Sequence, residues 1–427
     1  MLDLKFILSN LEQVKENCKN RNIRIDLDAL IKMDEKRRVL IGEVEDLRRQ
    51  QNENASAMKG KLPENERKTL IEKGRELKTK ENDKNSLLTQ ISADVESLLR
   101  QIPNMTHPKA PIAATEDGNK EIRRFGEPTK FNFTPKDHVT LGKDLDLIDF
   151  ETAASVSGQK FYFLKNEAVL LEFALIQYAL NTLIKKGFTP IITPDLAKAN
   201  ILDGIGFNPR GAETQIYSVE NTDLCMIATA EITLGGMLAD KILSESELPL
   251  KFVGVSHCFR TEAGAAGKES KGLYRVHQFT KIEMFAFTLP QDSEDMHEKF
   301  VSYEEELFKG LGIPFRVVDI CTGDLGGPAY RKYDLEAWMP GRGEKGDWGE
   351  VTSTSNCTDY QARRLKIRFR KENEKKNEFV HMLNGTAIAI SRALIAILEN
   401  YQQENGSIKI PEALKPYMNG LASIRKK

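Results

Sequence analysis

Two long stretches near the start of the chain repeat mainly apolar residues at alternating steps of three and four. The first runs from Leu30 to Gln51 and the second from Leu70 to Ile102. This spacing is typical of helices that pack along a narrow coiled-coil seam. Between them, KGKLPENERK contains Gly60 and Pro63, which break helices. We therefore expect an antiparallel helical hairpin over about residues 27–102, with helices of about 30 residues and about 45 Å each.

The seam is imperfect, because Arg37, Gln51, Gly74, Glu81 and Lys84 occupy core positions. A hairpin of two helices is too thin to bury many side chains, so it tolerates such residues. The tip and its flanks are basic and contain Arg48, Arg49, Lys59, Lys61, Arg67 and Lys68. Two interpretations stay open at this point: an ordinary solvated charged face, and a surface that binds phosphate groups.

The pattern changes after QIPNMTHPKAP, whose prolines end the second helix and indicate a linker. Short β-rich runs (KFYFL, KFVGVSHCF, KIEMFAF) then alternate with helical segments at Asn166–Lys186 and Ser391–Gln402. Because the β-rich runs follow one another without crossover helices, we expect an α+β domain with an antiparallel sheet. The predicted domains are residues 1–105, containing the hairpin, and residues 106–427.

Composition narrows the class of protein. The chain has 427 residues, of which 40% are hydrophobic, and a formal net charge of −1, so no global basic field indicates a nucleic-acid partner. The five cysteines are scattered without a CxxC pair, which argues against a disulfide framework or a structural zinc site. MLDLKFILSN does not resemble a secretory signal, and we find no stretch of about 20 apolar residues. We expect a soluble protein of a reducing compartment, the cytoplasm, with no membrane contact.

Candidate chemistry concentrates between Phe259 and Phe285. KFVGVSHCF predicts one strand and Arg275–Phe287 predicts the next, which places Arg275, Phe279 and Glu283 on one face along about 27 Å at most. GAAGKESKG connects the strands and would suit a mobile lid. It is not a Walker loop, because Glu262 and Glu269 stand where that motif needs Gly and Ser or Thr. A hairpin with a charged solvent face would explain the charges, but not the aromatic ring among them.

FRTEAG…RVHQFTKIEMF resembles motif 2 of the class II aminoacyl-tRNA synthetases, and in particular of the seryl-tRNA synthetases. The resemblance covers essentially the whole chain: MLDLKFILSNLEQVKENCKNR, the hairpin, IATAEITL, GDLGGPAYRKYDLEAWMP, GEVTSTSNCTDYQARRL and NGTAIAISRALIAILENYQ occur in the order of that family. The class I sequences HIGH and KMSKS are absent. The resemblance implies an antiparallel class II catalytic domain with an N-terminal coiled-coil arm. It also implies that the protein ligates L-serine to tRNA(Ser) with ATP, a step of protein biosynthesis. Charging of tRNA(Sec) stays open.

The resemblance implies roles for the residues of motifs 2 and 3. Arg260 would hold the α-phosphate and the carboxylate of the amino acid, and a fixed guanidinium suits both. Glu262 would bind the adenine amino group, and Phe279 would stack on the adenine. Arg392 would stack on its other face and contact the γ-phosphate, and these two arginines are the catalytic candidates. Arg275 would lie at the phosphates. The other interpretation of Arg392, an ordinary surface arginine, fits poorly with its apolar neighbours.

GEVTSTSNC resembles the segment that contributes ATP and magnesium ligands. Glu350 and Ser353 would hold Mg²⁺ together with phosphate oxygens, and Val351, Thr352 and Thr261 complete the implied ATP site. Positions three apart point to opposite faces of a regular strand. We therefore expect either a bulge in this strand or one indirect contact.

The implied serine pocket would satisfy an ammonium, a carboxylate and one hydroxyl group. Such a site rejects alanine, because polar groups would stay unpaired, and rejects larger side chains by volume. The chain has Thr261 and Thr386 where Ser is common in the family, and Gly385–Thr386–Ala387 departs from the usual Gly-Ser-Gly. No zinc site like that of the rarer archaeal form is expected. The pocket residues would be Thr229, Ala230, Glu231, Arg260, Glu283 and Thr386.

The resemblance also implies partners. The arm would bind the long variable arm of tRNA(Ser) through its backbone, which favours the phosphate-binding interpretation. GFTPIITPDL (Gly187–Leu196) resembles motif 1, which forms the homodimer interface, although an ordinary buried strand would look similar. Two alternative functions predict different sequence features. A ligase that charges a carrier protein should lack the arm, and an RNA-binding relic should have lost some of Arg260, Glu283, Glu350 or Arg392.

Overall fold

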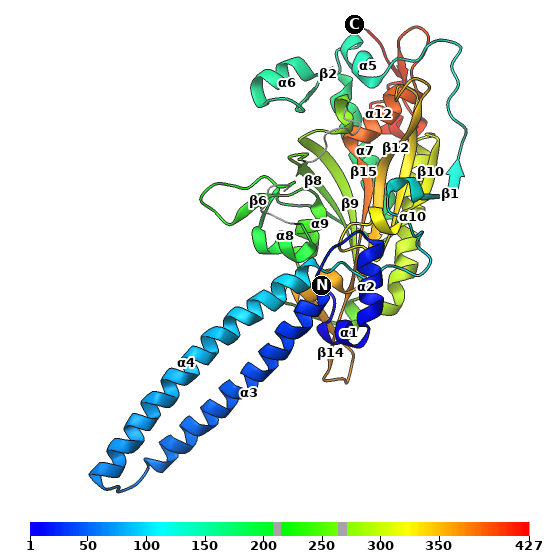
Figure 1. Ribbon diagram of the computed structural model, residues 1–427. Coiled ribbons are helices and arrows are strands. Elements are labelled where there is room, and N and C mark those ends of the chain that lie inside the picture. The colour runs from blue at the N-terminus through cyan, green and yellow to red at the C-terminus, as the bar shows by residue number, and fades with distance from the viewer. Residues whose placement is uncertain (208–214, 264–270, 427) are drawn as a thin grey trace. The chain divides into compact units, whose positions relative to one another are not determined.

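The computed structural model describes residues 1–207, 215–263 and 271–426, and the chain divides into two compact units, Met1–Pro103 and Asn104–Lys427 (Figure 1). The division falls close to the predicted boundary after residue 105. Each unit is described by itself below.

The first unit is helical. Its described helices are α1 (Leu4–Ser9), α2 (Leu11–Asn20), α3 (Leu27–Ala57) and α4 (Glu64–Gln101). The Asp26 carboxylate caps α3 by accepting from the Ala29 amide at 2.8 Å, and Pro63 immediately precedes α4. The two long helices run antiparallel, joined by the segment that contains Gly60 (Figure 1). The predicted helical hairpin is thus confirmed, with 31 and 38 residues in its helices, so α4 is longer than expected.

Polar residues in the seam of the hairpin bond across it. Gln51 Nε2 donates to the Leu77 carbonyl at 3.2 Å, and Asn54 Nδ2 donates to the Leu70 carbonyl at 2.9 Å. A Cβ atom on Gly74 would lie 3.1 Å from Asn54 Nδ2, so the glycine leaves space for this amide. These bonds reach free backbone carbonyl lone pairs of the facing helix and satisfy the amides without a wide core.

Charges also pair across the hairpin, which explains two of the acidic and basic seam positions. Arg48 Nε lies 3.0 Å from Glu81 Oε1, and Lys84 Nζ lies 2.7 Å from Glu43 Oε2. Exposed pairs of this kind contribute little stability. All six basic residues at the tip and its flanks are exposed, namely Arg48, Arg49, Lys59, Lys61, Arg67 and Lys68.

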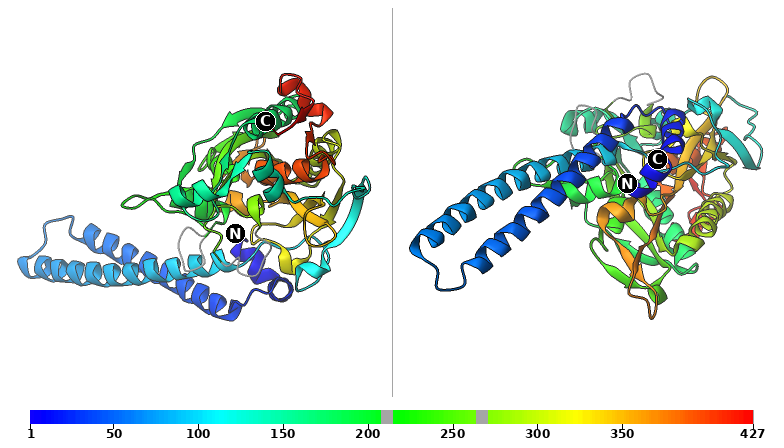
Figure 2. Two further views of the ribbon diagram at one scale, coloured as in Figure 1. Left: turned by 90° about the horizontal axis from the view of Figure 1, so that it is seen from above. Right: turned by 60° about the horizontal axis from the view of Figure 1, so that its bottom comes forward.

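The second unit is built on a mixed sheet. Among the described residues eight strands join in the order β1-β10-β11-β12-β15-β9-β8-β4, and every neighbouring pair is antiparallel except β4 with β8 (Figures 1 and 2). The antiparallel prediction is confirmed, with one parallel edge. The strands are β1 (Lys120–Phe125), β4 (Thr189–Ile192), β8 (Leu250–Phe259), β9 (Gln278–Thr288), β10 (Phe315–Asp319), β11 (Arg331–Met339), β12 (Asp347–Asn356) and β15 (His381–Ala389).

Short strands pair outside the main sheet. Of the predicted strand KFYFL, only Phe163–Leu164 is extended in a ladder, as β3. The remaining strands are β2 (Ile148–Asp149), β5 (Leu196–Lys198), β6 (Leu224–Met226), β7 (Ile242–Ser244), β13 (Arg368–Arg370), β14 (Asn377–Phe379), β16 (Ile408–Lys409) and β17 (Ser423–Ile424).

Helices cover both faces of the main sheet and form two cores. One core joins the sheet to α7 (Glu167–Ile184), α10 (Ser293–Gly310) and α12 (Ile390–Asn400), and the other joins it to α8 (Ala199–Ile205), α9 (Ala230–Gly236) and α11 (Tyr360–Leu365). Alternation along β9 separates them, because Ile282 and Met284 enter the first core and Phe285 and Phe287 the second. Two further helices are α5 (His138–Asp144) and α6 (Phe150–Ser157).

Helix α7 corrects one expectation. We expected no apolar stretch of this kind, but α7 has 18 residues and is apolar enough by length and composition to cross a membrane. Its inner face, including Leu171, Leu175 and Leu183, is completely buried in the first core, as in a core helix. Its outer face is apolar as well, with Phe173 at 61% exposure.

Candidate active site

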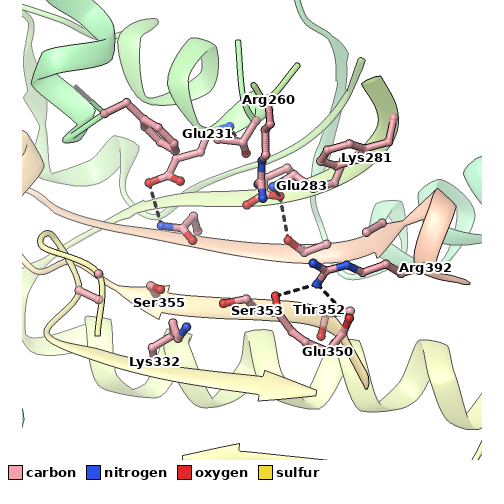
Figure 3. A pocket seen from close by; sticks show the side chains of 18 of the residues that line it. Glu231, Arg260, Lys281, Glu283, Lys332, Glu350, Thr352, Ser353, Ser355 and Arg392 are labelled. Carbon is pink, nitrogen blue, oxygen red and sulfur yellow. Dashed lines mark hydrogen bonds and ion pairs between the residues drawn. The ribbon is translucent and has the colours of Figure 1, made fainter. Parts of the chain in front are cut away.

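A cavity of about 500 Å³ opens on the sheet face opposite α7 and α10, between the sheet and α9 (Figure 3). It brings together nearly all of the predicted site residues from five separate segments of the chain. Those that line it are Thr229, Glu231, Arg260, Glu262, Arg275, Phe279, Glu283, Glu350, Val351, Thr352, Ser353, Thr386 and Arg392.

Two predicted residues, Ala230 and Thr261, are not among those that line the cavity. The Ala230 side chain is fully buried, and a Cβ atom on Gly254 of β8 would lie 3.1 Å from its Cβ. The glycine therefore lets α9 pack close to the sheet, which carries Thr229 and Glu231 to the cavity. Only the backbone of Ala230 is left to reach a ligand.

The row of side chains on β9 forms one wall. Phe279, Lys281 and Glu283 line the cavity, as expected for alternate residues of one strand. The predicted strand start at Arg275 is wrong: β9 begins at Gln278, after the 3₁₀ turn Gly272–Tyr274. Arg275 still lines the cavity, but the turn places it there rather than the strand.

Arg260 follows directly after β8 and is held by its backbone. Its amide donates to the His277 carbonyl at 3.0 Å, and His277 Nδ1 donates to the Arg260 carbonyl at 2.7 Å. The first bond continues the β8–β9 ladder and the second adds a side-chain contact, and the Arg260 side chain points into the cavity (Figure 3). Its guanidinium carbon lies 5.3 Å from the centroid of the Phe279 ring.

Glu262 and Arg275 form an ion pair at 3.1 Å. Glu262 has a φ of +54°, a conformation that L-residues rarely adopt and that often marks functional positions. Its carboxylate is thereby held beside the guanidinium at the cavity wall. The predicted lid between the two residues falls on positions 264–270, which lie outside the described residues.

A bulge in β12 resolves the conflict over Glu350 and Ser353. Thr352 pairs with Leu335 and Glu350 with Glu336, so Val351 has no partner of its own on β11. The extra residue interrupts the alternation of side chains. Glu350 and Ser353, three positions apart, can therefore face the same cavity, as Figure 3 shows. Of the two alternatives, the structure has the bulge.

Glu350 is paired with Arg392, which lies in the first turn of α12. Arg392 Nη1 is 3.1 Å from Glu350 Oε1 and donates to the Glu350 carbonyl at 2.9 Å. Burial raises the pKa of Glu350, but Arg392, Lys332 and Arg260 outweigh it and leave the pKa below its ordinary value. The carboxylate is therefore ionised at neutral pH. Arg392 is only 16% exposed, so it is not an ordinary surface arginine.

Glu283 is buried and has two partners. Lys281 Nζ lies 2.6 Å from Glu283 Oε2, and Thr386 Oγ1 donates to the same oxygen at 3.2 Å. Thr386 faces Glu283 directly across the β15–β9 ladder. Lys281 lies two residues before Glu283 on β9 and therefore shares its face of the strand, but the family resemblance assigned it no role.

Glu231 is held by two amides that the sequence gave no reason to select. Gln361 Nε2 and Asn384 Nδ2 donate to Glu231 Oε1 at 2.7 and 2.9 Å, so Oε2 remains for a ligand. Burial, with the nearby charge of Glu283, raises the pKa of Glu231 to about 7. Asn384 lies two residues before Thr386 on β15, and strand alternation could have found it. Gln361 lies on α11, and no local signal marks it.

A second acid lies behind the cavity wall. Glu304 of α10 is 1% exposed and accepts from Thr352 Oγ1 at 2.8 Å. Burial raises the pKa of Glu304 well above its ordinary value, which favours the neutral acid. Thr352 thus points away from the cavity into the core, and its backbone is the part nearest a ligand.

Within the described ranges, no group of three or more His, Cys, Asp or Glu side chains could hold a metal ion. The Glu350 carboxylate and the Ser353 hydroxyl form a smaller set, and this set fits Mg²⁺ only if phosphate oxygens complete the coordination. The ionised, 41% exposed Glu350 carboxylate meets the first requirement for such a ligand.

The lining of the cavity combines guanidinium groups, an aromatic ring and carboxyl groups. Guanidinium groups suit phosphate and carboxylate groups, the ring suits a planar base, and buried carboxylates suit an ammonium. The arrangement can therefore hold a nucleotide and an amino acid next to each other. It contains no activated nucleophile, which fits a reaction driven by positioning and electrostatics.

Comparisons with known proteins agree with this geometry. Residues 1–106 match the family model of the seryl-tRNA synthetase N-terminal domain, and residues 216–401 match that of the class II tRNA synthetase core domain for G, H, P, S and T. A serine–tRNA ligase of Treponema denticola is 58% identical over 417 residues, covering 98% of both chains.

Solved structures extend the likeness. The seryl-tRNA synthetase of Pyrococcus horikoshii, complexed with ATP, is 42% identical with a TM-score of 0.90 and full coverage of both chains. The cytoplasmic serine–tRNA ligase of Naegleria fowleri, in complex with AMP, is 33% identical with a TM-score of 0.84, covering 98% of this chain and 96% of that one.

Proposed function

The chain belongs to the seryl-tRNA synthetase family, and from this premise we infer how its residues carry out the reaction. It is a serine–tRNA ligase, which activates L-serine with ATP and transfers the serine to tRNA. We propose that the serine carboxylate attacks the α-phosphorus in line, releases pyrophosphate and forms seryl-adenylate. A hydroxyl of the terminal adenosine of the tRNA then attacks the carbonyl carbon of the adenylate, forms the ester and releases AMP. The observation that carries this proposal is the single cavity that joins the adenine, phosphate and serine candidates.

ATP would replace internal contacts of the site. The Arg260 guanidinium lies over the Phe279 ring, and Arg275 forms an ion pair with the Glu262 carboxylate. On our proposal, adenine stacks on Phe279, and its amino group donates a hydrogen bond to the Glu262 carboxylate. Arg275 and Arg260 are then released to bind phosphate oxygens, and Arg260 stabilises charge at the α-phosphorus. Arg392 closes the other face of adenine and reaches the γ-phosphate.

Serine would be held by Glu231, Glu283, Thr229 and Thr386. The ammonium lies between the two carboxylates, and the hydroxyl bonds to Glu283 or Thr386. Alanine leaves these groups unpaired, which costs more binding energy than a missing apolar contact would. Lys281 already neutralises Glu283 at 2.6 Å, so an incoming ammonium must compete with it.

Mg²⁺ would be held by Glu350 and Ser353 on the two sides of the bulge, with ATP phosphate oxygens as the remaining ligands. When bound, it would neutralise negative charge on the phosphates. The residues of the chain still position the nucleotide, because Arg260 and Arg392 carry the guanidinium contacts. Asp334 and Lys332 lie beside Glu350 and form a second ion pair at 3.3 Å.

The helical arm would bind tRNA(Ser) through phosphate contacts of its exposed cations. Lys59, Lys61, Arg67 and Lys68 are exposed near the tip, whereas Arg48 already pairs with Glu81. This difference favours the tip over the middle of the hairpin as the electrostatic contact. We expect the enzyme to work in the cytoplasm, where its tRNA is found, and its described cysteines are all free and buried.

We also propose a homodimer. Strand β4 is the last strand of the main sheet, so one of its edges has no neighbouring strand there, and Ile192 at its end is 87% exposed. Phe173 and Ile184 on α7 expose a further apolar surface, at 61% and 45%. A second copy of the chain packed on β4 and α7 would bury both features.

Serine-dependent exchange between ATP and pyrophosphate tests the catalytic proposal. The full chain should catalyse exchange with serine far better than with any other amino acid, including alanine, threonine and glycine. Arg260→Lys, which keeps the charge but loses the planar fork, should reduce the rate by about 100-fold or more. If another amino acid dominates the exchange, the pocket assignment is wrong.

Removal of the arm separates activation from transfer. A variant in which Leu40–Ile91 is replaced by a short linker should keep pyrophosphate exchange and lose tRNA charging. Four Glu substitutions at Lys59, Lys61, Arg67 and Lys68 should weaken charging in the intact hairpin, with a smaller loss at high salt. Loss of exchange in both variants would mean that the arm is needed for the structure of the enzyme rather than for tRNA.

A further inference from the structure

Tyr274 lies between two arginines. The guanidinium carbon of Arg392 is 4.6 Å from the centroid of its ring, and that of Arg342 is 4.5 Å from the same centroid. Two groups of the same charge fit best on opposite faces of a ring. Tyr274 also lines the cavity, although motif comparison assigned it no function.

The ring supplies a contact that Arg392 would otherwise lack during the reaction. In the ligand-free structure the ion pair with Glu350 holds Arg392. On the proposed function, the Glu350 carboxylate turns to Mg²⁺, so its pull on Arg392 weakens as ATP binds. The bond from Arg392 to the Glu350 carbonyl and the stacking on Tyr274 do not depend on that carboxylate.

Arg342 depends on the same ring. Its Nε atom is 4.0 Å from Asp347, at the limit of an ion pair, and its Nη1 atom is buried without a hydrogen-bond partner in the described part of the chain. Besides this distant pair, the ring of Tyr274 is the contact shown for the Arg342 guanidinium in the described part of the chain. Repulsion between the two cations favours opposite faces of the ring, and on that arrangement Arg342 would cover the face away from Arg392.

A buried pair of residues fixes the backbone of all three. Glu399 of α12 accepts from His138 Nδ1 at 2.8 Å and from the Gly341 amide at 2.8 Å. His138 Nε2 in turn accepts from the Leu273 amide at 3.1 Å, next to Tyr274. One acid on the helix of Arg392 thus ties down the segments of Arg342 and Tyr274.

The packing at this point depends on a glycine. Gly272 has a φ of +57°, and a Cβ atom on it would lie 2.2 Å from His138 Nε2. The turn Gly272–Tyr274 can therefore approach the imidazole only without a side chain at this position. The backbone is built to hold Tyr274 at this place beside α12.

We propose that Tyr274 is a positioning residue for Arg392: with Arg342 on its other face, the ring holds the Arg392 guanidinium in the plane in which it meets adenine and the γ-phosphate. This inference rests on the proposed function of Arg392. It extends the stack beyond the nucleotide, from Phe279 through adenine and Arg392 to Tyr274 and Arg342.

Two substitutions of one residue test the role of the ring. Tyr274→Leu keeps apolar bulk and removes the π-face, whereas Tyr274→Phe keeps the face and removes the hydroxyl. In serine-dependent pyrophosphate exchange, Tyr274→Leu should raise the KM for ATP about tenfold, within the range of a desolvated cation–π contact, and leave the KM for serine within about twofold. Tyr274→Phe should restore the KM for ATP to within about twofold of that of the unmodified chain.

A second measurement separates positioning from general damage. Binding of a non-hydrolysable ATP analogue and of AMP is compared by calorimetry on the full chain. Tyr274→Leu should weaken the analogue more than AMP, because only the analogue carries the γ-phosphate. Arg342→Met should act in the same direction with a smaller effect.

Three results would overturn the inference: an unchanged KM for ATP in Tyr274→Leu, an equal loss in Tyr274→Phe, or a parallel rise in the KM for serine. A failure of the proposed function would look different. In that case the unmodified chain itself would show no serine-dependent exchange.

Discussion

On the proposed serine site, Glu231 should make serine binding depend on pH, and the raised pKa of its carboxyl group gives the direction. Its pKa is about 7 in the ligand-free enzyme, because burial and the charge of Glu283 oppose ionisation. Gln361 and Asn384 donate to Oε1, and on the proposed mode of binding Oε2 would accept from the serine ammonium. The ammonium favours the ionised carboxylate, so at acidic pH the enzyme must release a proton to bind serine.

The magnitude follows from the fraction of enzyme that is already ionised. A carboxyl group with a pKa of about 7 is about 9% ionised at pH 6 and about 91% at pH 8, so the apparent affinity for serine should rise about tenfold between them. The ammonium of serine stays protonated over this range. The same shift affects the free energy of unfolding. Because the pKa of Glu231 is higher in the folded chain than in the unfolded chain, protonated Glu231 stabilises the fold, and this stabilisation is lost as the pH rises from the ordinary carboxyl pKa to about 7.

The assay is the KM for serine in pyrophosphate exchange, measured at saturating ATP from pH 6 to pH 8. Glu231→Gln should remove the pH dependence and raise the KM at pH 8, because the amide cannot supply the charge. Glu151→Gln, at an exposed acid on α6, is the matched control. A flat KM in the unmodified chain, or a slope that persists in Glu231→Gln, would refute the reasoning.

Three further predictions concern other parts of the molecule. Thr386→Val removes the hydroxyl that donates to Glu283 and should raise the KM for serine about tenfold with little change in that for ATP; equal rises would contradict a serine contact. Glu350→Gln should increase the Mg²⁺ concentration needed for half-maximal exchange, and an unchanged requirement would remove Glu350 from the metal site. Ile192→Asp should shift the sedimentation of the chain from dimer to monomer, and an unaltered profile would place the interface elsewhere.

Periodicity in the sequence was enough to predict helices and strands, but not the residues at which they begin and end. The alternating three-and-four spacing located α3 and α4, because a helix seam repeats over many residues. The start of β9 was misplaced by three residues, because side-chain alternation continues through Arg275 although Gly272–Tyr274 is a 3₁₀ turn. Backbone turns at strand ends depend on tertiary contacts, here with His138, that one stretch of sequence does not contain.

The candidate site was predicted where the residues belong to known motifs and missed where they only support them. Gln361 and Glu304 come from helices far along the chain and bond groups at the cavity wall, Gln361 to Glu231 and Ile205 and Glu304 to Thr352. Tyr274 stands alone between a loop and a strand. Such residues cannot be recognised from their spacing in the sequence, because their role depends on the residues that they contact in the folded structure.

The bulge at Val351 has a consequence for how β12 can vary. One unpaired residue lets neighbouring acidic and hydroxyl groups point to the same side. Deleting it would restore a regular strand and turn either Glu350 or Ser353 toward the core, although every functional side chain would still be present. Changes in the length of this segment are therefore more damaging than most single replacements, and the strand can exchange side chains but cannot lose a position.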